Sequence, residues 1–290
     1  MSTRLTVGVL HPGAMGAAVA STLSRGGHDV VWASAGRSAA SRRRADEAGA
    51  RDVGELATLV RVSDAIVSVC PPGAAPDLAR AVSEAGFDGT YLDANAVSPM
   101  RAKEIAALTE STGARFVDGG IVGGPPSERG TTWLHLAGPD ATEVAAWFAA
   151  GPLETNVVGD RIGDASALKA CFAAWTKGRT ALQTTILAAA QAYGVREPLR
   201  DQWERYEPGF LAGSEARARR VTAKAWRFEA EMHEIAAAFE AVGLPGGFHR
   251  AAADVYGRLA PLRPDEADGV SDEPDLAAVL RALLDGRTSD

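Results

Sequence analysis

The sequence predicts an α/β fold in which an N-terminal doubly wound sheet is followed by an all-α C-terminal domain. Through the first half of the 290 residues, short apolar runs alternate with helical segments, which is typical of βαβ units and a mostly parallel sheet. After Gly163 the strand-like runs stop and long alanine-rich stretches begin. We therefore expect two domains, 1–161 and 162–290, with the boundary near Arg161.

Each expected strand is a short apolar run bounded by turn residues, which is the pattern of a buried strand. Because crossovers between parallel strands are right-handed, these strands and the helices between them predict a doubly wound sheet. The expected strands lie at 5–10, 30–33, 65–70, 90–93, 116–117, 132–137 and 156–158.

The helices of the first domain are delimited by caps and glycines. Gly26, Gly49 and Gly86 each follow a helical stretch and are expected to end it. Ser98 is a plausible N-cap, with Pro99 at the first helical position. The expected helices lie at 14–25, 38–48, 74–85 and 98–112.

The second domain reads as helices only. Its apolar stretches are long and lack the alternation of a half-buried strand. We expect helices at 165–192, 214–242, 248–259 and 276–284, and an acidic, proline-containing surface loop at 263–274.

Composition excludes several classes of function. The formal net charge is −7, which argues against a nucleic-acid partner. No apolar run reaches the roughly 20 residues of a membrane span, and no signal-peptide pattern opens the chain. No spacing of Cys and His suggests a metal site, and Cys70 and Cys171 read as buried thiols in a reducing compartment. We therefore expect a soluble, cytoplasmic protein.

The segment HPGAMG, residues 11–16, follows the first strand and opens the first helix. Gly13 and Gly16 occupy the second and third positions of a dinucleotide-binding G-x-G-x-x-G loop, and His11 replaces the first glycine. Because Pro12 follows, we expect extended backbone angles at His11. The N–H groups of Gly13, Ala14, Met15 and Gly16 remain as phosphate donors. A plain turn without a ligand is the alternative, but the βαβ context favours a dinucleotide.

The second strand indicates NADP rather than NAD. An NAD site usually has an acidic residue at the end of this strand, and here none occurs before Asp46. A guanidinium can bind the 2′-phosphate of NADP, and we expect Arg44 to lie on a solvated helix face. The candidate cofactor residues here are Ser34, Arg37, Ser38, Arg42 and Arg43, of which Ser34, Arg37 and Ser38 are favoured.

The order of motifs resembles the β-hydroxyacid dehydrogenase superfamily, which includes 3-hydroxyisobutyrate dehydrogenase, 6-phosphogluconate dehydrogenase and the imine reductases. HPGAMG resembles the family's G-x-G-x-M-G, and CPPG resembles its loop along the cofactor, which implies a role for Cys70 and Pro71. DANAVSP resembles its D-x-S-T-x-x-P, with Asn95 in place of the substrate-binding serine. Asn95 is therefore a candidate catalytic and cofactor-binding residue, which could hydrogen-bond a substrate carbonyl or carboxylate. The resemblance covers about the first 180 residues and implies a Rossmann domain followed by a helical substrate and dimerisation domain.

Two further motifs carry the implied chemistry. DGGIVGG resembles the family's D-A-P-V-S-G-G, so Gly123 and Gly124 match while Val122 replaces a serine that contacts a substrate carboxylate. GDASALKACFA resembles its G-x-x-x-K-x-x-x-N helix, which places the catalytic lysine at Lys169 and Ala173 where asparagine is usual. The substrate site is therefore expected to be less polar than in the hydroxyacid enzymes.

The residues favour a carbonyl reductase or alcohol dehydrogenase. Reduction of a carbonyl leaves charge on oxygen, and Lys169, flanked by apolar residues, can supply the proton. The alternative for Lys169 is a side chain that reaches solvent at the edge of its helix. The alternative for Asn95 is an Asx-turn residue that caps the next helix. Imine reduction and a non-catalytic NADP-binding sensor remain open as functions, and we expect a homodimer.

In the second half, the candidates for lining a substrate pocket are less specific. We expect Lys177 at the surface, and we interpret Trp226 and His233, seven residues apart, as a core stripe of one helix. The aromatic and histidine candidates are Trp175, Trp203, Tyr206, Trp226, His233 and His249.

Overall fold

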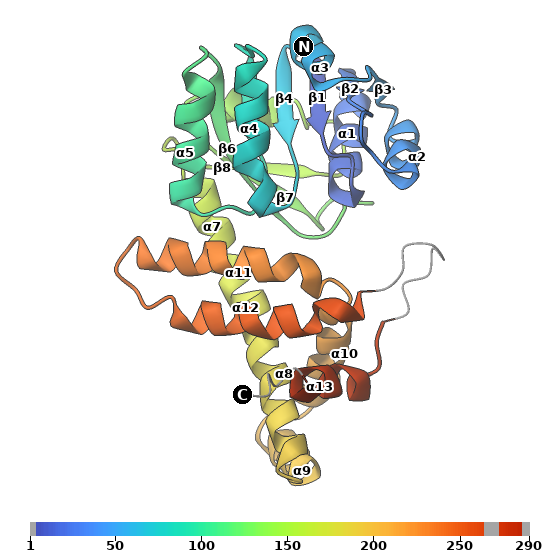
Figure 1. Cartoon of the computed structure of the whole chain (residues 1–290), viewed down its shortest axis with the longest axis vertical. Coiled ribbons are helices and arrows are strands. Elements are labelled where there is room, and N and C mark those ends of the chain that lie inside the picture. Colours follow the sequence, from blue (N-terminus) through green and yellow to red (C-terminus); the bar gives the residue numbers. More distant parts are fainter. Residues whose placement is uncertain (1–3, 264–272, 286–290) are drawn as a thin grey trace. The chain divides into compact units, whose positions relative to one another are not determined.

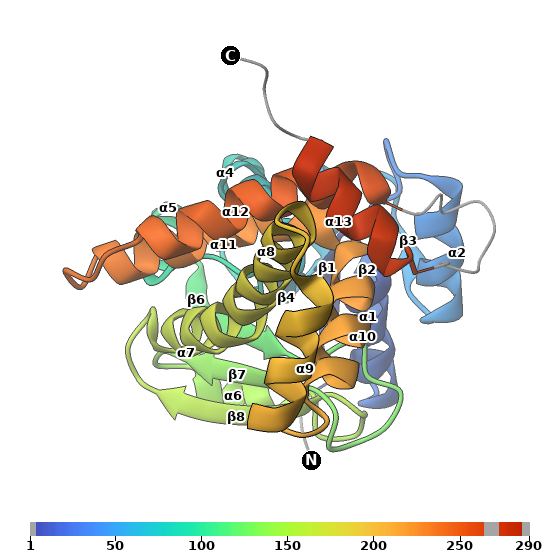
Figure 2. The same cartoon turned by 90° about the horizontal axis from the view of Figure 1, so that it is seen from below.

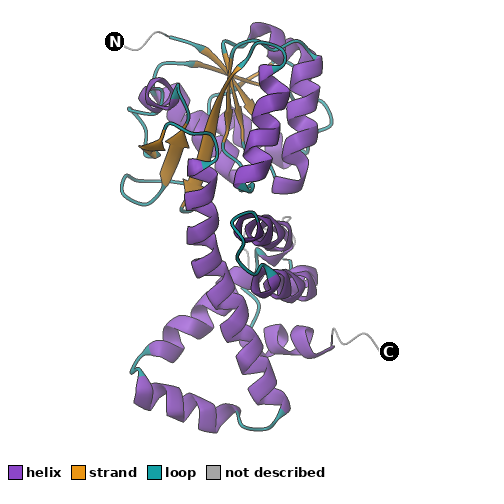
Figure 3. Cartoon of the chain, turned by 90° about the vertical axis from the view of Figure 1, so that its left-hand side faces the viewer, coloured by secondary structure: helices purple, strands orange, loops and turns teal. Residues whose placement is uncertain are grey.

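The computed structural model describes residues 4–263 and 273–285 (Figure 1). The chain divides into two compact units, Met1–Ala170 and Cys171–Asp290. All strands of the described residues belong to the first unit, and the second consists of helices and their connections (Figure 3). The predicted fold class is confirmed. The division falls inside the helix that carries Lys169, later in the chain than the expected boundary near Arg161.

One sheet forms the centre of the first unit, with strand order β3-β2-β1-β4-β5-β6-β7-β8. Strands β1 to β6 pair in parallel, β7 is antiparallel to β6, and β8 is parallel to β7. The order reverses between β1 and β4, which is where doubly wound sheets place a ligand. The strands are β1 (Thr6–Leu10), β2 (Asp29–Trp32), β3 (Arg51–Asp52), β4 (Ala65–Ser68), β5 (Thr90–Asp93), β6 (Arg115–Val122), β7 (Trp133–Ala137) and β8 (Glu154–Gly159).

Helices cover both faces of this sheet, because alternate strand residues point to opposite faces and both sets are apolar. Val7 and Val9 of β1 pack with α1 and α6 on one face, whereas Leu10 packs with α4 and α5 on the other. Figure 2 shows α4 and α5 on one side and α1 and α6 on the opposite side. The helices of this unit are α1 (Ala14–Arg25), α2 (Ala39–Glu47), α3 (Leu56–Val62), α4 (Ala75–Glu84), α5 (Pro99–Glu110), α6 (Ala141–Ala146) and α7 (Asp164–Ala173).

The second unit is a set of packed helices. Helices α11 and α12 run along each other, and α8 contacts α9, α10, α12 and α13. None of the helices in the described part of the chain is both long enough and apolar enough to span a bilayer. The helices are α8 (Arg179–Ala192), α9 (Arg196–Tyr206), α10 (Phe210–Thr222), α11 (Ala225–Glu240), α12 (Gly247–Leu259) and α13 (Leu276–Asp285).

Most of the expected elements are present, and those that the sequence analysis missed are short or polar. The missed elements β3, α3 and α6 are two to seven residues long, too short to show a period. Helix α9 buries none of its residues, so it has no apolar stripe to detect.

Two long helices of the expected set are interrupted. The 165–192 stretch contains a π-helical turn at Ala174–Gly178, and the 214–242 stretch breaks at Lys224 between α10 and α11. Neither break contains a proline from which it could have been predicted. Helix α10 packs on α8 and α13 while α11 packs on α12, so the break at Lys224 follows from tertiary packing. Residues 264–272 of the expected acidic loop lie outside the described residues.

Helix α7 begins on a buried carboxylate of the sheet. Asp118 of β6 accepts hydrogen bonds at Oδ2 from the backbone N–H groups of Gly163 (2.9 Å) and Ser166 (3.0 Å). Its Oδ1 accepts a hydrogen bond from the Ser166 hydroxyl at 2.5 Å. Asp118 therefore satisfies donors at the start of a helix that the sequence places 45 or more residues later.

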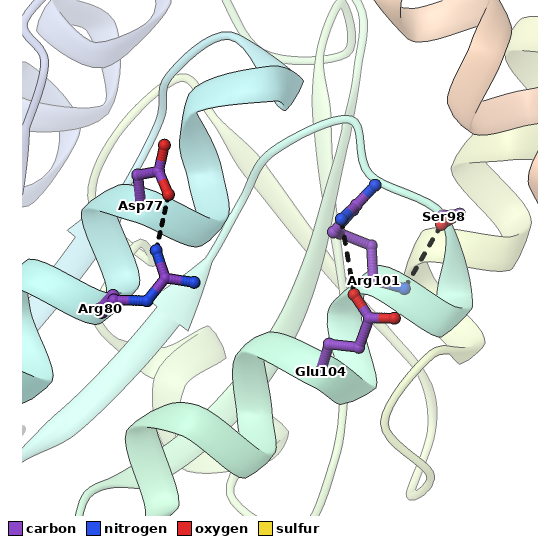
Figure 4. Close-up of polar contacts among 5 residues, drawn as sticks. All are labelled: Asp77, Arg80, Ser98, Arg101 and Glu104. Carbon is purple, nitrogen blue, oxygen red and sulfur yellow. Dashed lines mark hydrogen bonds and ion pairs between the residues drawn. The ribbon is translucent and has the colours of Figure 1, made fainter.

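Replacement of Asp118 by alanine is expected to destabilise the protein by about 2–4 kcal/mol, because three buried donors would lose their acceptor. The free energy of unfolding from urea titration followed by circular dichroism measures this loss. The matched control is Asp77→Ala, which removes an exposed carboxylate that pairs with Arg80 on α4 (Figure 4). Surface pairs contribute about 0–1 kcal/mol, so an equal loss in both variants would contradict the role of Asp118.

Candidate functional site

The predicted cofactor residues gather where the parallel strands end. The loops after β1, β2 and β4 carry His11, Arg37 and Cys70. The charge of Arg37 acts on the titration of both His11 and Cys70, so these three loops meet at one edge of the sheet. This edge contains the position at which strand order reverses.

The turn after β1 is tighter than the sequence analysis expected. His11 has φ +65°, and it is the one non-glycine residue with positive φ in the described chain. The prediction of an extended His11 is therefore wrong. The Gly13 N–H donates to the His11 carbonyl at 2.7 Å, which closes a turn around Pro12. A left-handed backbone costs a non-glycine residue about 1–2 kcal/mol. This turn would therefore favour glycine at position 11, as in the G-x-G-x-x-G loop.

Helix α1 leaves backbone donors at its first turn. Its N-cap residue is Gly13, which has no side chain to cap the N–H groups of Ala14, Met15 and Gly16. The Gly13 N–H, also predicted to be a donor, is already bonded within the turn. A Cβ on Gly13 would meet no atom within 4 Å, whereas one on Gly16 would collide with the His11 carbonyl oxygen. The loop thus has donors beside open space, and these fit a pyrophosphate.

The arginines after β2 have different surroundings. Arg42 donates to the Ser34 carbonyl at 3.2 Å and lies 3.7 Å from Asp52 of β3. Arg44 donates to the Pro12 carbonyl at 3.3 Å, so the prediction of a solvated Arg44 is wrong. The backbone N–H of the half-buried Arg37 donates to the Ser34 carbonyl at 3.1 Å. Its guanidinium forms no hydrogen bond or ion pair with any residue that the structure describes.

This loop leads into α2, and its serines have local roles. Ser38 caps α2, with its hydroxyl accepting from the Ser41 N–H at 3.2 Å. The buried Ser34 contacts Asp52 through a side-chain hydrogen bond, which helps to hold the pKa of Asp52 below its usual value against the opposing effect of burial. Asp52 is an acidic residue near the end of β2 that sequence reasoning missed, because it comes from the next strand.

Asn95 holds the Cys70–Pro71 loop in place. Its Oδ1 accepts from the Cys70 N–H at 2.5 Å, and its Nδ2 donates to Ser68 and Asp93, both at 3.0 Å. Asn95 is 3% exposed, and both amide hydrogens are used. Ser98, whose hydroxyl accepts from the Arg101 N–H, caps α5 (Figure 4), so the alternative in which Asn95 caps that helix is wrong.

Two buried carboxylates lie side by side beneath this edge. Asp93 of β5 and Asp118 of β6 are paired in register. Burial raises the pKa of Asp93 to about 7. Hydrogen bonds from Asn95 oppose this shift, and the charge of Asp118 adds to it. Burial also raises the pKa of Asp118, against hydrogen bonds from Ser166 and Gly163. In the sequence, Asp93 and Asp118 are only the first residues of the DANAVSP and DGGIVGG motifs, and neither was given a role.

The same buried environment controls the protonation of the Cys70 thiol. Burial first, and the charge of Asp93 second, raise the pKa of the Cys70 thiol to about 12. Cys70 therefore stays a neutral thiol at physiological pH. Both cysteines are free, but Cys171 is exposed, so its predicted burial is wrong.

Lys169 lies against β6, the strand that contains the first residues of the DGGIVGG motif. Its Nζ donates to the Ile121 carbonyl at 2.6 Å. A Cβ on Gly120 would lie 2.9 Å from both the Lys169 Cβ and the Ala165 carbonyl oxygen, so only glycine lets α7 approach β6 this closely. Burial and the charge of Lys169 lower the pKa of His135 on β7, which pairs with Gly120. Sequence reasoning assigned no role to His135.

The Val122–Gly124 segment begins at the last residue of β6. Gly123 has φ +122°, and a Cβ there would collide with Thr131 and Thr132. The Thr132 hydroxyl donates to the Gly124 carbonyl at 2.6 Å, which fixes the loop. Val122, Gly123 and Gly124 are thus adjacent to the carbonyl that Lys169 binds, and they offer no side-chain donor.

Several predictions for the second unit are corrected. Lys177 is not at the surface: its side chain is 15% exposed, and it pairs with Glu231 and lies 4.4 Å from the ring centre of Phe228. Trp226 and His233 are exposed, so they form no core stripe. Of the remaining candidates, Ala173 and His249 are buried, Trp203 is half-buried, and Trp175 and Tyr206 are exposed.

Comparison with known proteins gives the family. Residues 6–148 match the family model described as the NAD binding domain of 6-phosphogluconate dehydrogenase. Residues 190–259 match a domain of unknown function, DUF1932. Together with the similar proteins below, these matches support placing the chain in the β-hydroxyacid dehydrogenase superfamily.

Two 3-hydroxyisobutyrate dehydrogenases are among the similar proteins. The mitochondrial enzyme of Drosophila melanogaster is 27% identical over 145 residues, which are 48% of this chain and 44% of that enzyme. The Mycobacterium tuberculosis enzyme, solved with L-serine, is 20% identical with a TM-score of 0.66, covering 97% of this chain and 99% of that chain. An imine reductase variant from Myxococcus stipitatus, solved with NAD+, is 19% identical with a TM-score of 0.55, covering 97% and 100%. The two structural likenesses show the fold.

The site can hold a nicotinamide cofactor along the edge formed by the three loops, in keeping with the match to an NAD binding domain. Ala14, Met15 and Gly16 can bind the pyrophosphate, and Arg37 and Ser38 lie at the end of the second strand. A bound nicotinamide supplies hydride-transfer chemistry. Lys169 contributes an ammonium group on the strand-β6 side of the site.

Replacement of Asp93 by asparagine is expected to change the pH dependence of stability. A raised native pKa means that the folded protein holds a proton which the unfolded chain loses near pH 4, so wild-type stability falls as the pH rises toward 7. Relative to Asp93→Asn, the wild-type free energy of unfolding should fall by up to about 1.4 kcal/mol per pH unit between pH 5 and 7, and level off above. Urea titrations across this range measure the difference. A constant difference would show that Asp93 titrates normally.

Proposed function

We propose that the chain is an NADP-dependent oxidoreductase that transfers a hydride between the nicotinamide and the carbonyl carbon of a small ketone or β-hydroxyacid-like substrate, with Lys169 as general acid and base. The observation that carries the proposal is the position of Lys169. Its Nζ is bonded to the Ile121 carbonyl, beside Val122–Gly124, on a helix held by Asp118. Asp118 is paired in register with Asp93. Asp93 accepts a hydrogen bond from Asn95, and Asn95 in turn accepts one from the Cys70 N–H.

The proposed proton transfer balances in both directions. In reduction, the hydride reaches the carbonyl carbon and the electron pair of the C=O bond moves to oxygen. That oxygen takes a proton from the Lys169 ammonium group, and in oxidation the neutral amine takes it back from the alcohol. An ammonium group also stabilises the charge that develops on oxygen.

The preference for NADP rests on the loop after β2. No acidic residue lies in the chain between this strand and Asp46, and Asp52 faces Ser34 and Arg42. Arg37 is half-buried without a carboxylate partner in the described chain. A buried guanidinium without an anion is costly, which favours a phosphate as its ligand.

Imine reduction is a second candidate, and Val122 favours it. This apolar side chain stands where the resemblance implies a serine that contacts a substrate carboxylate, and an imine brings no carboxylate. Asn95, also in a substrate motif, has both amide hydrogens bonded within the protein. Both observations support a substrate less polar than a hydroxyacid.

We further propose that the protein is a homodimer formed through its helical unit and that it acts in the cytoplasm. Exposed apolar side chains recur at intervals of three, four or seven residues along the end of α7, the π-helical turn and α8, a spacing found in helix–helix seams. The exposed residues are Phe172, Trp175, Leu182, Ile186 and, just after α8, Tyr193. The two free cysteines are in keeping with a reducing compartment.

Replacement of Lys169 by alanine or methionine is expected to lower kcat about 10²–10⁴-fold, because the proton donor is lost. The affinity for NADPH, from quenching of tryptophan fluorescence, should be unchanged. A panel of ketoacids, aldehydes and cyclic imines supplies the turnover assay, and exposed Lys103→Ala is the control. Binding of NADPH without turnover of any panel member by the wild type would instead support the non-catalytic sensor.

The double substitution Leu182→Glu and Ile186→Glu is expected to give a monomer, because two charges would be buried in the helix–helix seam. Light scattering should report twice the 30.1 kDa chain mass for the wild type and a single chain mass for the variant. Val242→Glu, another exposed apolar site of the helical unit, should leave the dimer intact. A monomeric wild type at micromolar concentration would contradict the proposal.

A further inference from the structure

His11 combines two features that a simple turn does not require. Its backbone is left-handed, which glycine would adopt without strain. Its Nδ1 is buried and has no hydrogen-bond partner in the described part of the chain. A strained residue with an unpaired buried polar atom marks a position where a ligand completes the hydrogen bonding.

The charged groups around His11 leave room for an anion. Arg37 lies close enough for its charge, after burial, to lower the pKa of His11 to about 4, so the imidazole is neutral without a ligand. Arg37 also interacts with the Cys70 thiol, which is neutral, and Arg44 donates to the carbonyl of Pro12, the residue after His11. Asp52 is engaged with Ser34 and Arg42. No carboxylate is bonded to Arg37 or His11 among the described residues.

We propose that His11 is a cofactor-binding residue that acts with Arg37 to bind the phosphate on the adenosine ribose of NADP. This inference rests on the proposed function, since it assigns a specificity role within the proposed cofactor site. In this inference, the replacement of the first glycine by His11 does not impair the loop, because the imidazole adds a contact to the cofactor.

Binding of the phosphate would resolve both features of His11. A phosphate oxygen accepts a hydrogen bond from the imidazole, and its negative charge offsets Arg37. With that charge present, the imidazolium form is stabilised, so the bound state takes up a proton that the free protein lacks. The left-handed backbone angle is then the conformation that directs the side chain toward this contact.

The experiment compares two nucleotide probes, adenosine 2′,5′-bisphosphate and adenosine 5′-diphosphate, by isothermal titration calorimetry at pH 7. These probes report binding without turnover. The variants are His11→Asn, which tolerates a left-handed backbone, and His11→Gly, which restores the usual loop residue. The matched control is His233→Asn, an exposed histidine of α11.

The wild type is expected to bind the 2′,5′-bisphosphate at least tenfold more tightly than either His11 variant. Affinity for the 5′-diphosphate should stay within twofold. In buffers of different ionisation enthalpy, the wild type should take up more protons on binding the bisphosphate than His11→Asn does. Thermal unfolding should show His11→Gly at least as stable as the wild type, which separates lost binding from lost folding.

Two outcomes would overturn the inference: the first leaves the proposed function intact, and the second also removes its preference for NADP while leaving the oxidoreductase. One is equal or tighter binding of the bisphosphate by His11→Gly. The other is a wild type that binds the 5′-diphosphate and NADH but shows no gain from the 2′-phosphate. A wild type that binds neither probe nor NADPH would remove the proposed function, and this inference with it.

Discussion

The candidate site depends on the register of two buried carboxylates, Asp93 and Asp118, at the ends of neighbouring parallel strands. Asp93 and Asn95 support the loop that carries Cys70 and Pro71, and Asp118 holds the first turn of the helix that carries Lys169. Each carboxylate is surrounded by donors, which offsets the cost of its burial. The loop that carries Cys70 and the proposed acid are thus positioned by two sets of hydrogen bonds, which are centred on neighbouring positions of the sheet.

Close backbone approach is the second constraint. Helix α7 lies against β6 because Gly120 has no side chain, and helix α1 lies against the His11 carbonyl because Gly16 has none. Both glycines bring a helix near a strand end, one beside the proposed acid and the other beside the proposed phosphate donors. Tight packing at these two points leaves the donors and the ammonium group few alternative positions.

Much of the architecture could be predicted, because it is encoded in local patterns. Apolar runs of strand length, glycines after helices and a serine–proline cap located all the longer elements of the first unit, and α1 and β5 have the predicted bounds. The shortest elements and the polar α9 could not be found, since they carry no period. The half-buried Lys177 was taken for a surface residue because its partner, Glu231, lies more than fifty residues later in the sequence.

The sequence by itself determined the fold class, the family and the chemical types at the site: a helix N-terminus with small residues, an arginine after the second strand, and a lysine in an apolar helix. These features depend on neighbours within a few residues, so a linear reading can detect them. Only the tertiary structure decided that His11 is left-handed, that Asn95 is a support for the Cys70 loop, and that Asp118 begins the Lys169 helix. Those contacts join residues 25 to 48 positions apart, or depend on a turn closed against a neighbouring helix, and only the folded chain brings them together.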